Sequence, residues 1–145
     1  MQDHVLHSLT IAQVMVNYAL ERGVATSAIL KDTGIDDAQL GDPEALITPD
    51  QELVLISNLQ AAFAGTPALG FEVGLQYALS TFGVWGFTLS ISENMAQGFE
   101  RAVRFLALST AYCAVGIDRG ARGFRITFNP EHIPQAQRRF LLGRD

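Results

Sequence analysis

The sequence is poor in charged side chains and in cysteine. Only 17% of its 145 residues are charged, and Cys113 is its single cysteine. One cysteine excludes an internal disulfide framework and is typical of proteins in a reducing compartment. No basic segment precedes an apolar run at the start of the chain, so we predict no signal peptide. No apolar run approaches the roughly 20 residues of a membrane-spanning helix. We therefore expect a cytoplasmic protein that contacts no membrane.

Motifs that carry catalysis or bind metals and cofactors are also lacking. Neither a glycine-rich phosphate loop nor a G-x-S-x-G nucleophile elbow occurs in the sequence. The three histidines, His4, His7 and His132, have no cysteine or carboxylate cluster at metal-ligand spacing. Cys113 has apolar neighbours, which favours a buried structural thiol over a nucleophile. We predict no catalytic residue, no metal site and no cofactor, and we do not expect an enzyme.

Apolar residues, in contrast, make up 48% of the chain, which is enough for one domain with a sizeable core over residues 1–145. Charge is distributed unevenly along it. Residues 1–100 carry two basic and twelve acidic side chains, whereas residues 101–145 carry eight arginines and three acidic side chains. The acidic first part opposes direct nucleic-acid contact by this chain. The basic second part is either a solvated arginine-rich hairpin or a complement to the acidic part, within the chain or across a dimer.

The first third of the chain has the pattern of helices. Apolar residues recur with helical spacing over residues 8–22, and the glycine that follows ends this pattern. A short helix then reaches Leu30, with Thr26 or Ser27 as its cap. Two helices around a glycine turn resemble a helix-turn-helix. The signal is weak, because Ala25–Lys31 offers one lysine and no arginine to phosphates or bases.

Two further helices are predicted in the middle of the chain. Thr48 is the N-cap of one of them, a proline follows in its first turn, and Gln51 completes a capping box. The other covers residues 67–78 and contains Gly70 and Gly74. Each glycine destabilises a helix by about 1 kcal/mol relative to alanine. Their spacing therefore predicts close backbone packing against a neighbouring element.

The second half combines helices with a hairpin. Residues 82–92 fit a buried helix or a buried strand, and we favour the helix. A clear helical pattern follows from its cap at Asn94 to Thr110. Apolar residues then alternate on both sides of a turn at residues 118–121, which predicts an antiparallel hairpin with one buried face. A last helix starts at Pro134. The predicted fold class is α+β, mostly helical, with a C-terminal antiparallel β-hairpin packed on the helices.

Aromatic side chains and arginines gather in the second half of the chain and suggest a ligand site. Apolar walls beside an arginine suit a small organic anion, since arginine binds carboxylates in a bidentate manner. The alternative is that these aromatic residues simply fill the core. The candidate ligand-binding residues are Phe82, Trp85, Phe87, Arg104, Phe105, Tyr112 and Arg125.

Several short segments occur in a characteristic order along nearly the whole chain. They are Gly23-Val24, Ile29-Leu30, Thr33-Gly34-Ile35, Leu46-Ile47-Thr48, Pro67-Ala68-Leu69-Gly70-Phe71, Gly74, Phe82-Gly83-Val84-Trp85-Gly86-Phe87, Ser92, Asn94-Met95, Ala102, Arg138-Arg139-Phe140-Leu141-Leu142 and Arg144-Asp145. Together they resemble the arabinose-binding-domain type of N-terminal region in AraC-family transcription regulators. The chain departs from this resemblance at Gly143, where a glutamate commonly stands.

The resemblance implies a region that senses a small organic effector and mediates dimerisation. In such regulators a separate C-terminal domain with two helix-turn-helix motifs binds DNA. The resemblance therefore implies an incomplete sensory domain without the helix-turn-helix domain, and it assigns DNA binding to no residue of this chain. It does not identify the effector. We expect a homodimer.

Two alternatives belong to other functional classes. The chain could be a stand-alone homo-oligomeric interaction module without a small-molecule ligand. Exposed apolar residues on the last helix, such as Phe140 and Leu141, would favour this reading, because they attract a partner. A small enzyme would require an unexpected polar cavity around Arg104 and Tyr112.

Overall fold

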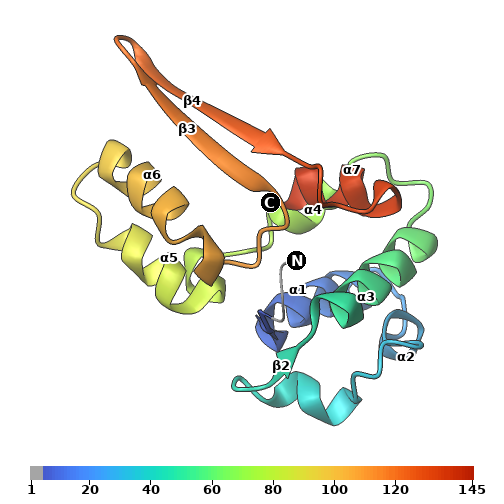
Figure 1. Cartoon of the computed structure of the whole chain (residues 1–145). Helices are drawn as coiled ribbons and strands as arrows, with labels where there is room; N and C mark the ends of the chain where they lie inside the picture. The colour runs from blue at the N-terminus through green and yellow to red at the C-terminus, as the bar shows by residue number, and fades with distance from the viewer. Residues whose placement is uncertain (1–4) are drawn as a thin grey trace.

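The computed structural model describes residues 5–145, which form helices and two small antiparallel sheets (Figure 1). The α-helices are α1 (Leu9–Leu20), α2 (Thr26–Ile29), α3 (Pro49–Ala62), α4 (Leu69–Gly74), α5 (Gly83–Ser90), α6 (Met95–Arg104) and α7 (Gln135–Arg144). The strands are β1 (His7–Ser8), β2 (Leu46–Ile47), β3 (Ala114–Gly120) and β4 (Gly123–Asn129). The 3-10 helices are η1 (Asp37–Gly41), η2 (Leu79–Phe82) and η3 (Leu106–Leu108). The predicted α+β class is confirmed. His4, one of the three histidines considered above, lies outside the described residues.

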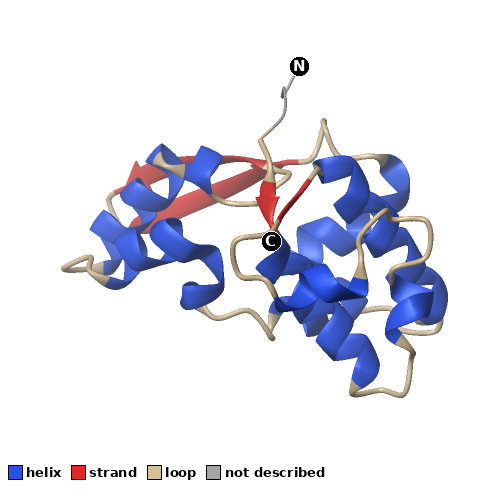
Figure 2. Ribbon diagram, turned by 90° about the horizontal axis from the view of Figure 1, so that it is seen from below, coloured by secondary structure: helices blue, strands red, loops and turns tan. Residues whose placement is uncertain are grey.

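These elements form two regions, which lie side by side in Figures 1 and 2. We call residues 5–78 and 130–145 the helical core, which contains α1 to α4 and α7. We call residues 79–129 the outer lobe, which contains α5, α6, the β3–β4 hairpin and two 3-10 helices. Among residues 5–145, no helix is long and apolar enough to cross a membrane.

The helical core is organised around α1 and α3. Leu55, Ile56 and Leu59 recur at helical spacing on α3 and are fully buried against the apolar face of α1. The predicted capping box starts α3: the Thr48 hydroxyl accepts from the Gln51 amide at 3.2 Å, and the Gln51 side chain accepts from the Thr48 amide at 3.0 Å. The short pair β1–β2 then places the start of α1 beside the start of α3.

The last helix, α7, packs closely on α4 inside the helical core. A Cβ at Gly70 would lie 2.1 Å from the carbonyl oxygen of Phe140, and one at Gly74 would lie 2.9 Å from that of Arg144. The two glycines therefore allow backbone contact, as their spacing predicts. Phe140 and Leu141 are buried in this interface. The exposure of these two residues, which would favour a stand-alone interaction module, is therefore not found, because α4 and α3 cover both side chains.

The outer lobe packs α5 against α6 and lays the hairpin over α6 (Figure 1). Its first α-helix confirms the helical interpretation of residues 82–92. In the hairpin Val115 faces Phe128 and Ile117 faces Ile126. The predicted buried face is wrong, since Ile126 is 36% and Phe128 47% exposed. The covering elements reach only part of this face.

Several predicted boundaries differ from the observed ones. The helix expected over residues 67–78 is reduced to α4, and the turn of the hairpin lies at residues 121–122 instead of 118–121. Neither Thr26 nor Ser27 caps α2, because the cap position is Ala25.

The helix expected to reach Thr110 also ends early. It stops at Arg104, and a 3-10 helix over Leu106–Leu108 follows. The Ser109 hydroxyl then donates to the carbonyl of Leu106 at 2.7 Å and accepts from the amide of Ala111 at 3.2 Å, and such local bonds compete with helical hydrogen bonds. The α-helix therefore ends before the apolar pattern does.

Candidate functional site

A cavity of about 370 Å³ lies where the helical core meets the outer lobe. Every major element of the lobe contributes to it, and α1, α7 and the segment after α4 close it from the core side. Its lining residues are Ile11, Gly74, Tyr77, Leu79, Phe82, Trp85, Phe99, Ala102, Val103, Leu106, Ser109, Thr110, Ala111, Val115, Ile117, Ile126, Phe128, Arg144 and Asp145. This size and this mostly apolar lining are typical of small-molecule sites.

Three aromatic rings form one continuous wall of the cavity. Tyr77 stacks on Phe82 with ring centroids 5.7 Å apart, and Phe82 meets Trp85 edge-on at 5.5 Å. The indole N–H of Trp85 donates to the Ala102 carbonyl at 3.1 Å, and the Tyr77 hydroxyl donates to the Ile11 carbonyl at 3.0 Å. Both polar tips are therefore anchored in the protein, and the flat faces of the rings are oriented by these bonds.

On the core side, the cavity is lined by Arg144 and Asp145, which belong to a buried network of charged groups. Glu52 is fully buried on α3, and its carboxylate accepts from His7 Nδ1 at 2.5 Å and from the Tyr112 hydroxyl at 3.1 Å. Arg144 reaches the other carboxylate oxygen from the end of α7. Asp145 accepts from Arg144 Nε at 2.9 Å and from the Tyr112 amide at 3.1 Å. The network thus joins β1, α3, α7 and the segment before β3.

Electrostatics within this network keep its acid and base charged. Burial by itself raises the pKa of Glu52, but the attraction of Arg144 and the hydrogen bonds from His7 and Arg144 outweigh it, and the pKa lies below its usual value. Burial by itself lowers the pKa of Arg144. The negative charges of Asp145 and Glu52 raise this pKa by more than burial lowers it, so the net shift is upward. Burial and the neighbouring Glu52 carboxylate raise the pKa of Tyr112. Its hydroxyl therefore stays protonated as a donor.

The predicted ligand-binding residues do not all meet at one place. Phe82 and Trp85 line the cavity together. Tyr112 lies beside it, in the charge network and in a neighbouring hollow of about 440 Å³. Their role in binding a ligand stays a prediction.

The remaining predicted residues lie away from the cavity. Phe87 is exposed on α5. The Arg104 guanidinium lies 5.5 Å from the ring centroid of Phe105, at the C-terminal end of α6. Neither side chain of this pair lines the cavity. The cation that does line it is Arg144.

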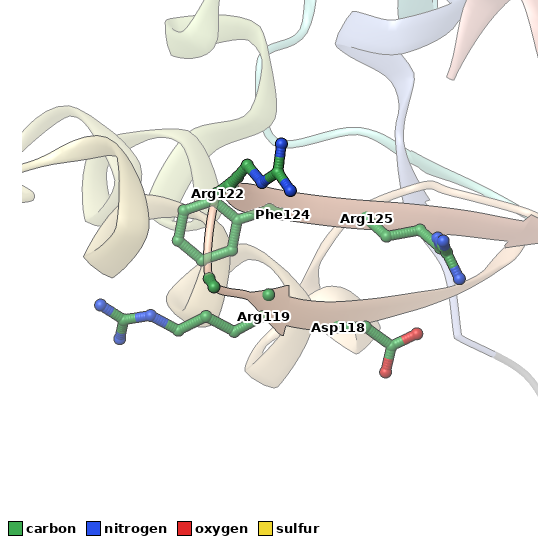
Figure 3. Close-up of a pocket in the computed structure, with 8 residues that line it drawn as sticks. Asp118, Arg119, Arg122, Phe124 and Arg125 are labelled. Atoms are coloured by element: carbon green, nitrogen blue, oxygen red, sulfur yellow. The ribbon is translucent and has the colours of Figure 1, made fainter.

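Arg125 lies near the tip of the hairpin, where Figure 3 shows Arg119, Arg122 and Arg125 pointing in different directions. An open hollow of about 550 Å³ surrounds this tip. Arg119 makes an exposed ion pair with Glu100 at 3.8 Å. The hairpin arginines are therefore exposed, as in the first interpretation of the basic second part, whereas Arg144 complements the acidic part within the chain through a buried pair with Glu52.

Sequence reasoning missed Glu52, His7, Arg144 and Asp145. One signal was available for the first of them. Glu52 precedes Leu55, Ile56 and Leu59 by three, four and seven residues, so it occupies the apolar stripe of α3. A carboxylate in such a stripe is buried only with partners. The partners could not be found in this way, since they lie 45 and 92 residues away.

Two further features concern metal-ligating side chains and the single cysteine. Residues 5–145 contain no group of three or more histidine, cysteine, aspartate or glutamate side chains placed to hold a metal ion. Cys113 is buried just before β3, as predicted, and burial raises the pKa of its thiol.

Comparisons with known proteins give a consistent result. The family model described as the arabinose-binding domain of AraC transcription regulator, N-terminal, matches residues 23–144. The chain is 29% identical over 141 residues to HTH-type transcriptional regulators of Mycobacterium bovis and Mycobacterium tuberculosis. These alignments cover 97% of this chain and 41% of each relative, so the chain spans about two fifths of their length. No solved structure matches.

Proposed function

The chain belongs to the family of the N-terminal arabinose-binding domain of AraC transcription regulators, and we propose that it senses a small organic effector for such a regulator. The regulator acts in the cytoplasm and binds DNA through a helix-turn-helix domain that is distinct from residues 1–145. These residues serve as one sensing and dimerisation domain. They make no nucleic-acid contact, since the hairpin arginines are balanced by a strongly acidic first part.

The observation that carries this proposal is the position of the cavity. Its walls come from both regions: Tyr77 and Arg144 belong to the helical core, and Trp85 and Val115 belong to the outer lobe. A ligand in this place contacts both regions at once. If it binds one relative placement of the two regions more tightly, it shifts the population towards that placement. Such a shift is what a sensing domain passes to the rest of a regulator.

The single tryptophan provides a direct test. Trp85 lines the cavity, so an effector should change its fluorescence and raise the thermal unfolding midpoint of the purified chain when a metabolite library is screened. Ligand that binds only the folded state stabilises it by RT ln(1 + [L]/Kd), or about 2.7 kcal/mol at a hundred times Kd. A library that changes neither signal would count against the proposal.

A second candidate is a homo-oligomeric interaction module without a ligand. It is favoured by apolar side chains that stand exposed on the lobe, among them Val84, Phe87 and Met95. Light scattering at micromolar concentration tests it, together with the homodimer that we also propose for the sensing domain. A monomer would exclude both forms of self-association at that concentration and leave effector binding as the remaining proposal.

A further inference from the structure

We propose that the cavity takes an uncharged, predominantly apolar molecule, not a carboxylate or a sugar. This inference rests on the proposed sensing function and names the chemical class of its effector. It departs from the organic anion expected from the sequence, because the arginines behind that expectation, Arg104 and Arg125, do not line the cavity.

Most polar side chains around the cavity are already hydrogen-bonded to the protein. Trp85 Nε1 donates to Ala102, the Tyr77 hydroxyl to Ile11, and the Ser109 hydroxyl to Leu106. Of the described polar side chains in the lining, the hydroxyl of Thr110 alone makes no hydrogen bond within the protein. The cavity therefore offers a ligand one neutral hydroxyl in an otherwise apolar or internally bonded lining.

Arg144 is the one cation among the described residues that line the cavity, and its donors are already engaged. Each guanidinium nitrogen of Arg144 has an acceptor: Nε has Asp145 Oδ1, Nη1 has Glu52 Oε1, and Nη2 has Asp145 Oδ1 and the carbonyl of Thr110. The side chain is only 3% exposed. A bidentate contact between a ligand carboxylate and Arg144 would displace Glu52 or Asp145, which would leave a buried carboxylate without its cation.

The cost of removing water from a ligand also favours an apolar molecule. An anion in this cavity would give up its water next to two carboxylates, Glu52 and Asp145, that already share one arginine. A sugar would bury several hydroxyls opposite hydrocarbon and aromatic faces. Polar groups that are buried without partners are strongly disfavoured. An apolar molecule instead gains from contact with the Phe82, Trp85 and Phe99 rings.

The test uses a neutral apolar fluorophore, N-phenyl-1-naphthylamine, with the purified chain at pH 8. Binding is followed by the emission of the probe, and decan-1-ol, decanoate and L-arabinose compete for it. The alcohol and the carboxylate have the same chain length, so they differ mainly in charge. We expect decan-1-ol to displace the probe at a concentration at least tenfold lower than decanoate, and arabinose not to displace it.

A matched pair of variants locates the binding. Val103→Phe fills the cavity and should weaken probe binding at least tenfold, whereas Val84→Phe adds the same ring to an exposed site on α5 and should leave it unchanged. If Val103→Phe does not fold by circular dichroism, Ile117→Phe fills the same cavity from the hairpin. Equal loss in both variants, or none in the cavity variant, would place the probe elsewhere and overturn the proposal.

The possible failures separate the ligand class from the sensing function. Preferred binding of decanoate or arabinose would overturn the apolar class but keep effector sensing. If no probe binds and no member of the metabolite library binds, both the apolar ligand class and the proposed sensing function would be overturned.

Discussion

The helical core and the outer lobe use similar apolar residues but bury them to very different extents. In the core, Leu55, Ile56 and Leu59 are completely buried. In the lobe, which the structure describes in full, Cys113 is the only hydrophobic side chain that is buried, whereas Val84 is 73% and Met95 76% exposed. A fully buried aliphatic side chain stabilises a fold by about 1.5–3 kcal/mol. We therefore expect the core to supply most of the stability, whereas the lobe supplies partly exposed walls of the cavity.

The two regions also differ in how they use charge. The core encloses the Glu52–Arg144 pair, whereas the lobe carries the Glu100–Arg119 pair in solvent. Breaking a buried pair leaves an uncompensated charge in a medium of low polarity. An exposed pair loses little, because water and salt replace the partner.

The largest effect is expected for Arg144→Met. Glu52 would lose its cation while staying buried, and the free energy of unfolding should fall by about 3–5 kcal/mol. The matched control is Arg119→Met, which removes the exposed pair of the lobe and should cost no more than about 1 kcal/mol. Urea denaturation of both variants measures the difference. Equal losses would contradict the assignment of the charge network to the stable region.

Apolar truncation should give the next largest effect. Leu59→Ala removes a fully buried side chain from the core and should cost about 2–5 kcal/mol. Phe128→Ala removes a larger side chain from the hairpin, but because it is half exposed the loss should stay at about 1–2 kcal/mol. Urea denaturation gives both losses in the free energy of unfolding from the shift of the midpoint, provided that the dependence on urea concentration is the same for all three proteins. A greater loss from the larger but exposed phenylalanine would show that the hairpin face is covered in solution.

A smaller effect is expected where glycine permits close packing. Gly70→Ala places a methyl group against the backbone of α7 and should cost about 1–3 kcal/mol. Gly86→Ala creates a similar conflict with the carbonyl of Leu79 in the lobe. There the exposed 3-10 helix can move, so we expect less destabilisation and an altered Trp85 emission. Gly65→Ala, with open space around it, is the control. Identical thermal shifts at Gly70 and Gly65 would contradict the observed contact.

The smallest effect is a dependence of stability on acid. The pKa of Glu52 is lower in the folded state than its ordinary value of 4.5. Its contribution to stability is therefore complete above about pH 4.5 and is lost as the pH falls through the folded-state pKa. The difference in the free energy of unfolding between the unmodified chain and the Glu52→Gln variant should become smaller in that acid range. Glu44→Gln, at an exposed position, should follow the unmodified chain throughout. A constant gap down to low pH would refute the role given to Glu52.

Local features of the fold were predictable from the sequence. The capping box of Thr48 and Gln51 involves neighbours in the chain, and it is observed as predicted. The helical interpretation of residues 82–92 is confirmed as α5. The end of α6 was not predictable, because the apolar pattern continues beyond Arg104 while the backbone changes to a 3-10 helix. The apolar periodicity indicates which residues prefer burial, but it does not indicate where the backbone leaves the α-helix.

The candidate site could be predicted only in part, for a related reason. Phe82 and Trp85 were found because they are close in sequence and share one apolar segment. Arg144 was missed in favour of Arg104 and Arg125, although all three have the same chemistry. Only the packing of α7 on α4 decides which arginine reaches the cavity and which remain in solvent.

By itself, the sequence determined the class of fold, most of the helices, the hairpin and the need for close packing at Gly70 and Gly74. These properties follow from residue preferences over a few turns of chain. The tertiary structure alone decided that α7 is the partner of these glycines and that Glu52, His7 and Arg144 meet beside one cavity. Contacts across 45 and 92 residues depend on how whole helices pack, and no local pattern of one sequence encodes that arrangement.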